Sequence, residues 1–114
     1  MSETAVEVVQ HQLQAYNRRD IDAFVAAYHD EVRVFRLPST TPAMVGKPAL
    51  RAFYATKRFN LPGLHAEVRQ RIVLGNKVID QEYVTGLGDQ PLEVVAAYEV
   101  RDGLITTVWF LAPD

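Results

Sequence analysis

The sequence predicts an α+β fold, in which helices from the first half of the chain cover one face of an antiparallel sheet formed mainly by the second half. Two observations lead to this prediction. Apolar residues recur at helical spacing through the first half of the chain. Residues 91–111 instead alternate between apolar and polar residues on both sides of Asp102-Gly103, a pair that suits a tight hairpin because it tolerates positive φ angles. Helices grouped ahead of consecutive hairpin strands are typical of this class.

Three helices are expected. The first begins with the capping-box spacing of Thr4 and Glu7 and runs to about Arg18. Asp20 can cap a second, short helix, and Pro48 suits the first turn of a third. The apolar positions that would face the sheet are Val9, Leu13, Tyr16, Ile21, Phe24, Val25, Tyr28, Leu50, Phe53 and Tyr54.

The remaining segments predict strands and the loops between them. Residues 39–46 and 86–90 are rich in Ser, Thr, Pro or Gly and are expected to be loops. The expected strands are residues 32–37, 64–74, 77–85 and the two arms of the 91–111 hairpin. A sheet that curves over the helices as a cone would leave a cavity of the kind that binds small molecules.

Composition limits the function classes. Of the 114 residues, 48% are hydrophobic and 23% are charged, which is ordinary for a globular protein and supports a single domain over residues 1–114. A net charge of −2 gives no basic surface for a nucleic acid or an anionic membrane. No apolar stretch approaches the roughly 20 residues that span a bilayer. The chain starts without the pattern of a signal peptide, so a cytoplasmic protein is expected.

The sequence contains no motif for a metal or a cofactor, and neither is expected. There is no cysteine, which excludes disulfides, thiol nucleophiles and thiolate ligands. His11, His29 and His65 lack metal-ligand spacing. Gly86-Leu87-Gly88 lacks the third glycine and the following helix of a phosphate-binding loop.

Several local strings, in this order, carry a resemblance to a known superfamily. They are Ala15-Tyr16-Asn17, Asp20-Ile21-Asp22-Ala23-Phe24, Leu37-Pro38, Gly46-Lys47-Pro48-Ala49-Leu50, IVLGNKVID at 72–80 and YEVRDGLI at 98–105. The chain resembles the nuclear transport factor 2-like (NTF2-like) superfamily, in particular its SnoaL-like, steroid delta-isomerase-like branch. The resemblance implies a cone-shaped, cystatin-like α+β barrel of three helices on a curved sheet, often dimeric. Members include isomerases, epoxide hydrolases, polyketide cyclases, dehydratases and proteins without any chemistry, so the fold alone does not select a function.

The catalytic residues of two well-known branches are missing. By alignment, the base of ketosteroid isomerases falls on Arg36, their tyrosine on Gln12 and their protonated aspartate on Ala96. An arginine stays charged near neutral pH and cannot abstract a proton. The arginine and two aspartates of limonene epoxide hydrolase-like members fall on Tyr83, Thr85 and the tail near Pro113.

The same alignments imply which side chains face the cavity. They turn Arg36, Gln81 and Tyr83 inward, together with Ile79 and Thr85, and they send Asp80 and Glu82 to the outer face. A slip of one residue would exchange these two faces. The candidate catalytic residues are Arg36 and Tyr83, and the candidate ligand-binding residues are Gln12, Gln81, Tyr98 and Phe53.

Each catalytic candidate has an alternative role. Arg36 would stabilise negative charge on a ligand, or instead pair with Asp30, Glu31 or Asp114 at the mouth of the cone. Tyr83 would donate a hydrogen bond to a carbonyl or a leaving oxygen, or instead pack on the helices.

Two functions follow as hypotheses. The first is a SnoaL-like protein that binds a small, largely apolar molecule carrying a carbonyl or anionic group; as an enzyme it would be a cofactor-free isomerase, cyclase or lyase. The alternative is a non-catalytic ligand-binding or dimeric interaction domain. A homodimer through the outer face of the sheet, where Trp109 is expected, is compatible with both.

Overall fold

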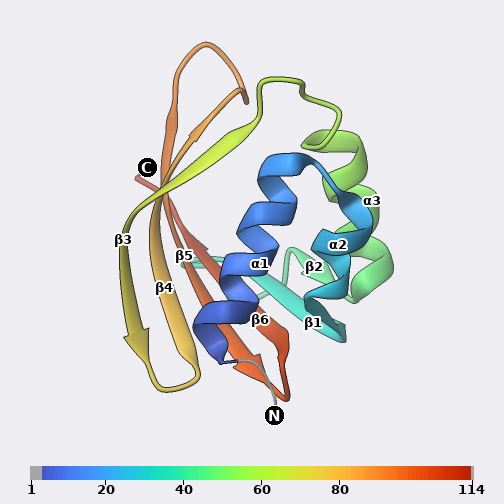
Figure 1. Cartoon of the computed structure of the whole chain (residues 1–114), viewed down its shortest axis with the longest axis vertical. Coiled ribbons are helices and arrows are strands. Elements are labelled where there is room, and N and C mark those ends of the chain that lie inside the picture. Colours follow the sequence, from blue (N-terminus) through green and yellow to red (C-terminus); the bar gives the residue numbers. More distant parts are fainter. Residues whose placement is uncertain (1–3, 114) are drawn as a thin grey trace.

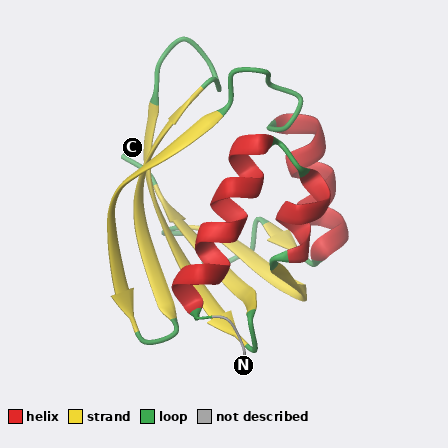
Figure 2. Ribbon diagram, viewed as in Figure 1, coloured by secondary structure: helices red, strands yellow, loops and turns green. Residues whose placement is uncertain are grey.

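The computed structural model describes residues 4–113, which form three helices and six strands (Figure 1). The elements in chain order are α1 (Ala5–Arg18), α2 (Ile21–Ala26), β1 (Tyr28–Arg36), β2 (Met44–Val45), α3 (Lys47–Lys57), β3 (His65–Leu74), β4 (Lys77–Thr85), β5 (Leu92–Arg101) and β6 (Leu104–Leu111). Figure 2 shows the helices as one layer beside the curved sheet. The predicted α+β class, with three helices on a curved sheet, is confirmed.

The strands form one sheet in the order β2-β1-β6-β5-β4-β3. Neighbouring strands are antiparallel except β1 and β6, which pair in parallel, so the sheet is mixed rather than purely antiparallel as predicted. A parallel pair needs a long connection. Here most of the chain, from β2 to β5, connects β1 to β6. The periodicity of a single strand carries no information about a partner so far away in the sequence. The sheet stays open, with β2 and β3 at its edges.

Tertiary pairing also moves two boundaries. Tyr28 was predicted to end the helical stripe of α2, but it begins β1 and pairs with Ile105 of β6. The predicted loop at 39–46 contains the short strand β2, whose Val45 pairs with Arg33. The apolar face predicted for β5 (Val94, Ala96, Tyr98 and Val100) is buried as expected.

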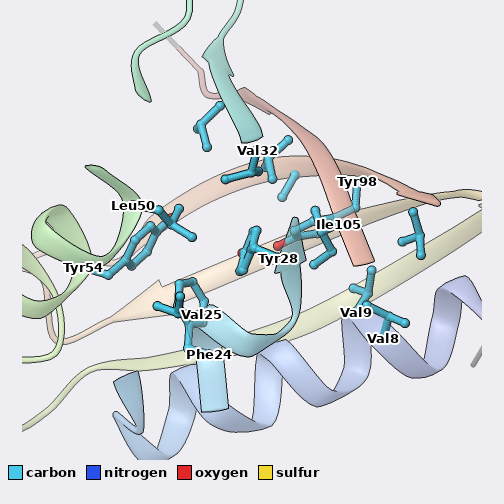
Figure 3. Close-up of a cluster of buried hydrophobic side chains, with 14 of the residues drawn as sticks. Val8, Val9, Phe24, Val25, Tyr28, Val32, Leu50, Tyr54, Tyr98 and Ile105 are labelled. Atoms are coloured by element: carbon cyan, nitrogen blue, oxygen red, sulfur yellow. The ribbon is translucent and has the colours of Figure 1, made fainter. Parts of the chain in front are cut away.

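The first two helices begin at the N-caps that the sequence predicts. The Thr4 side chain accepts from the backbone of Glu7, whose carboxylate accepts from the backbone of Thr4. Asp20 accepts from the backbone of Ala23 and caps α2. Side chains from all three helices converge around Tyr28 to form the core (Figure 3).

The facing of β4 is opposite to the prediction. Val78, Asp80, Glu82 and Val84 are buried on the concave side of the sheet, whereas the positions between them are only partly buried. Gln81 and Tyr83 therefore lie on the outer face, and their predicted inward orientation is wrong. Both faces of β4 carry large apolar residues, so its pattern does not by itself select one face. The alignment was out of register by one residue, which is enough to exchange them.

Candidate functional site

A cavity of about 450 Å³ lies between the concave face of the sheet and the helices. This volume is in the range of small-molecule sites. Its walls are mainly apolar and aromatic. Three charged side chains line it: Arg36 at the end of β1, Arg58 just after α3, and Glu82 in the middle of β4.

Glu82 is the buried member of these three charged residues, with 7% of its surface exposed. One of its carboxylate oxygens accepts a hydrogen bond of 3.2 Å from the Tyr98 hydroxyl. Burial, reinforced by the negative charge of Asp80, raises the pKa of Glu82 to about 7, while the Tyr98 hydrogen bond and Arg71 act in the opposite direction. A carboxyl with such a pKa can both take up and release a proton near neutral pH.

A chain of hydrogen bonds leads from Tyr28 to the Glu82 carboxylate. The Tyr28 hydroxyl donates to the Gln12 side-chain oxygen (3.1 Å), and the Gln12 amide nitrogen donates to the Tyr98 hydroxyl (3.4 Å). Tyr98 in turn donates to Glu82. The chain thus connects β1, α1, β5 and β4. Burial raises the pKa values of Tyr28 and Tyr98 well above the ordinary value, so both hydroxyls remain neutral donors.

The charge of Asp80, two residues before Glu82, is compensated by a cation. Arg71 of β3 binds both of its carboxylate oxygens, at 2.7 and 2.9 Å, and also donates to Gln10 of α1 at 3.0 Å. Asp80 is completely buried. Within residues 4–113 no cation forms an ion pair with Glu82, so the two neighbouring acids differ in their charge compensation.

Arg36 and Arg58 stand at the open side of the cavity beside the ring of Phe53. The Arg36 Cζ atom lies 5.7 Å from the Phe53 ring centroid and 6.0 Å from that of Phe110. The Arg58 Cζ atom lies 4.9 Å from the Phe53 centroid. Neither guanidinium forms an ion pair with a carboxylate in the described part of the chain.

The alternative partners considered for Arg36 are not engaged with it where the structure describes them. Asp30 instead lies 3.6 Å from the Lys47 ammonium group. Glu31 is exposed on β1 and forms no ion pair within residues 4–113. Asp114 lies outside the described residues.

Two tyrosines on the helices, interpreted from the sequence as core residues, also line the cavity. Neither Tyr16 nor Tyr54 has a hydroxyl hydrogen bond within residues 4–113, and no side-chain polar atom there is both fully buried and without a partner. Their hydroxyls are therefore accessible from the cavity. Burial raises the pKa of Tyr54 to about 12, with a smaller increase from Glu82 and smaller decreases from Arg58 and Arg36, so Tyr54 acts as a neutral donor.

The predicted site residues divide into two groups. Gln12, Arg36, Phe53 and Tyr98 line one cavity. Gln81 and Tyr83 do not, because they lie on the outer face; the Tyr83 ring is covered by the Arg69 guanidinium, with Cζ 3.8 Å from its centroid.

Glu82 was predicted to lie on the outer face and was therefore not among the predicted site residues. A usable signal was present, because Asp80 and Glu82 alternate with the same parity as Val78 and Val84. Burying those two valines brings both carboxyl groups to the concave face.

The described residues contain no cluster of three or more His, Asp or Glu side chains that could hold a metal ion. None of the helices within residues 4–113 is long and apolar enough to cross a membrane.

Comparison with known proteins identifies the family. The model of the SnoaL-like domain matches residues 9–108. The chain belongs to the SnoaL-like family. A comparison with the curated proteins finds no match.

Solved structures share the NTF2-like, cystatin-like architecture of this SnoaL-like chain. An uncharacterised cystatin-fold protein from Novosphingobium aromaticivorans is 25% identical, with a TM-score of 0.86 over 96% of this chain and 98% of that chain. A candidate ketosteroid isomerase from Kribbella flavida is 23% identical, with a TM-score of 0.82 over 99% and 80%. An epoxide hydrolase of the LEH-like type from Mycobacterium tuberculosis is 18% identical, with a TM-score of 0.77 over 96% and 82%.

Proposed function

We propose that this SnoaL-like protein binds a small, largely apolar molecule in the cavity and transfers protons on it without a cofactor. The observation that carries this proposal is the buried Glu82 carboxyl in the wall of an aromatic cavity, with a pKa of about 7. General acids and bases are most effective when their pKa lies near the working pH. The best-supported chemistry is abstraction of a proton next to a carbonyl, as in an isomerisation, a cyclisation or an elimination.

The neighbouring groups have distinct roles in this chemistry. Glu82 takes the proton and returns it to a different atom of the ligand, or to the leaving group. Tyr54, whose hydroxyl has no hydrogen-bond partner within residues 4–113, donates a hydrogen bond to the carbonyl oxygen as negative charge develops there. This role replaces the one predicted for Tyr83, which is on the outer face. Gln12 and Tyr98 orient Glu82, Phe53 forms part of the wall, and Arg36 favours negative charge at the open side.

Hydrogen–deuterium exchange tests proton abstraction without knowledge of the natural product. A panel of apolar cyclic ketones is incubated with the protein in D₂O, and exchange at the carbon next to the carbonyl is followed by NMR. We expect the wild type to accelerate exchange for at least one ketone, and Glu82→Gln to lose about a hundredfold or more of that acceleration. Tyr83→Phe, a change on the same strand but on the outer face, is the control and keeps the wild-type rate.

Equal exchange in the wild type and in Glu82→Gln would overturn the role of Glu82. Ligands that raise the melting temperature of the protein without any exchange would favour the non-catalytic alternative, a ligand-binding domain.

We also propose a homodimer through the outer face of the sheet. The Phe35 and Trp109 rings stack there with centroids 6.5 Å apart, and Ile72 on β3 is 59% exposed. Aromatic residues concentrate in protein interfaces. Sedimentation should give a dimer for the wild type and a monomer for Trp109→Glu; a monomeric wild type would contradict the dimer.

A further inference from the structure

The two arginines at the open side of the cavity share a single aromatic support. Arg36 comes from the end of β1 and Arg58 from the segment after α3, so distant parts of the sequence bring two guanidiniums to the ring of Phe53. Cation–π contacts hold a guanidinium over a ring while leaving its N–H groups free for other acceptors. The only hydrogen bond described for either side chain runs from Arg58 to the backbone oxygen of Lys57, at 2.9 Å.

This pair differs from most cations of the described chain, which have a carboxylate partner. The paired cations are Arg18, Lys47, Arg51, Arg69, Arg71, Lys77 and Arg101. At the cavity, two guanidiniums lie against the same Phe53 ring, and within residues 4–113 neither has a carboxylate partner. An anion beside this ring is attracted by both positive charges. A guanidinium fork matches the two oxygens of a carboxylate.

The same cavity also holds an acidic side chain, which disfavours an anion beside it. Glu82 is 7% exposed, and Asp80, two residues before it on the same face of β4, is completely buried. Tyr54 lines this cavity together with the two arginines and Glu82. Much of the remaining wall is aromatic, with Phe24, Phe110 and Tyr16 among its residues. The cavity thus combines two guanidiniums in contact with Phe53, an aromatic wall and one buried acid.

We propose that the ligand is an amphipathic carboxylic acid, whose carboxylate is held by Arg36 and Arg58 over Phe53 while its apolar body extends toward Glu82. This inference rests on the proposed function, since it concerns the same cavity. It assigns the arginines to a carboxylate that does not react, and it leaves the reacting carbon to Glu82 and Tyr54. The arginines and Glu82, which differ in charge, then orient the bound molecule.

Matched acid and amide pairs test the inference, because the two members of each pair share an apolar body and differ in charge. The probes are 2-naphthoic acid with 2-naphthamide, and decanoic acid with decanamide, titrated calorimetrically at about pH 8, where the acids are ionised. The variants are Arg36→Gln, Arg58→Gln and the double substitution. Arg33→Gln is the matched control, because it removes the same charge from the same strand but on the outer side of β1.

We expect the wild type to bind at least one acid more tightly than its amide. Each single substitution should weaken binding of that acid by about tenfold, as expected for loss of a charged hydrogen-bonding pair. The double variant should bind acid and amide equally, and Arg33→Gln should behave as the wild type.

The contradicting outcomes separate this inference from the proposed function. If amides bind as well as acids, or if Arg33→Gln weakens acid binding as much as Arg36→Gln, the carboxylate site is wrong while the cavity and Glu82 retain their proposed role. If no acid or amide binds to the wild type, the carboxylate site is also overturned. In that case ketone exchange that depends on Glu82 would still support the proposed function, and its absence would overturn both proposals.

Discussion

At the scale of single residues, Asp80 and Glu82 illustrate how the surroundings give two similar groups different chemistry. Both side chains are buried on the same face of β4. Arg71 neutralises Asp80 through two hydrogen bonds, whereas Glu82 receives one from a neutral tyrosine. Asp80 is thus paired with a cation, while its negative charge helps raise the pKa of Glu82.

The raised pKa of Glu82 should appear in the stability of the protein. In the folded state the pKa is about 7, compared with an ordinary value of 4.5. Between these values the folded protein keeps a proton that the unfolded chain releases, so stability should fall as the pH rises through this range and level off above it. Glu82→Gln cannot ionise, and its fall should be smaller by roughly 2–4 kcal/mol.

Denaturant unfolding of both proteins from about pH 5 to about pH 8 measures this difference. The comparison with Glu82→Gln cancels the other titrating groups. Parallel stability curves for the two proteins would contradict a raised pKa.

The Tyr98 hydroxyl is expected to tune Glu82. Its hydrogen bond favours the charged carboxylate, so Tyr98→Phe should raise the pKa of Glu82 further and move the fall in stability to higher pH. The variant also leaves the Gln12 amide without its acceptor, at a cost of about 1–3 kcal/mol. Tyr83→Phe makes the same chemical change on the outer face and should leave the midpoint unchanged. An unchanged midpoint in Tyr98→Phe would remove Tyr98 from the control of Glu82.

At the scale of secondary-structure elements, Arg71 links the edge strand β3 to β4 and α1. Its ion pair with Asp80 is largely buried, with 20% exposure of the Arg71 side chain and none of Asp80. Arg71→Met should destabilise the protein by about 3–5 kcal/mol, because it leaves a buried carboxylate unpaired. Arg69→Met is the control, since Arg69 forms a more exposed pair with Glu67 on the same strand. Equal losses of stability in the two variants would show that the buried ion pair contributes no more than the exposed one.

Gly86 fixes the contact between two loops beside the cavity. Its φ angle is +87°, and a Cβ atom there would overlap the backbone of Gly63 and Leu64. Gly86→Ala should therefore cost more than about 1 kcal/mol of stability. Gly88 lies in the same loop with open space around it, so Gly88→Ala should be close to neutral. Thermal unfolding of the two variants makes the comparison; equal melting temperatures would contradict the close approach of the loops.

The elements were largely predictable from the sequence because their signals are local. The capping box at Thr4, the cap at Asp20 and the Asp102-Gly103 turn each depend on residues within a few positions of each other. The parallel pairing of β1 with β6 and the facing of β4 depend on distant contacts. The candidate site was therefore predicted only in part. The predicted residues that line the cavity are Gln12, Arg36, Phe53 and Tyr98. The position of Glu82 depends on strand register, and this residue was assigned to the outer face.

At the scale of the whole molecule, the helices and the curved sheet enclose a cavity that is lined by side chains of both charges. Arg36 and Arg58 stand at the mouth, and Glu82 lies within the apolar interior. The sheet holds Glu82 and Tyr98, α1 supplies Gln12, and α3 supplies Phe53 and Tyr54. Such a division lets a rigid framework position the acid–base group while other elements shape the ligand.

The central claim is that Glu82 ionises near neutral pH in the folded protein, and its own titration tests this most directly. Protein labelled with ¹³C in its glutamates is followed by NMR as a function of pH, and the signal that disappears in Glu82→Gln identifies the group. We expect this carboxyl to titrate with a midpoint near 7. A midpoint near 4.5, the ordinary value of a glutamate, would contradict the claim and remove Glu82 as the acid–base group.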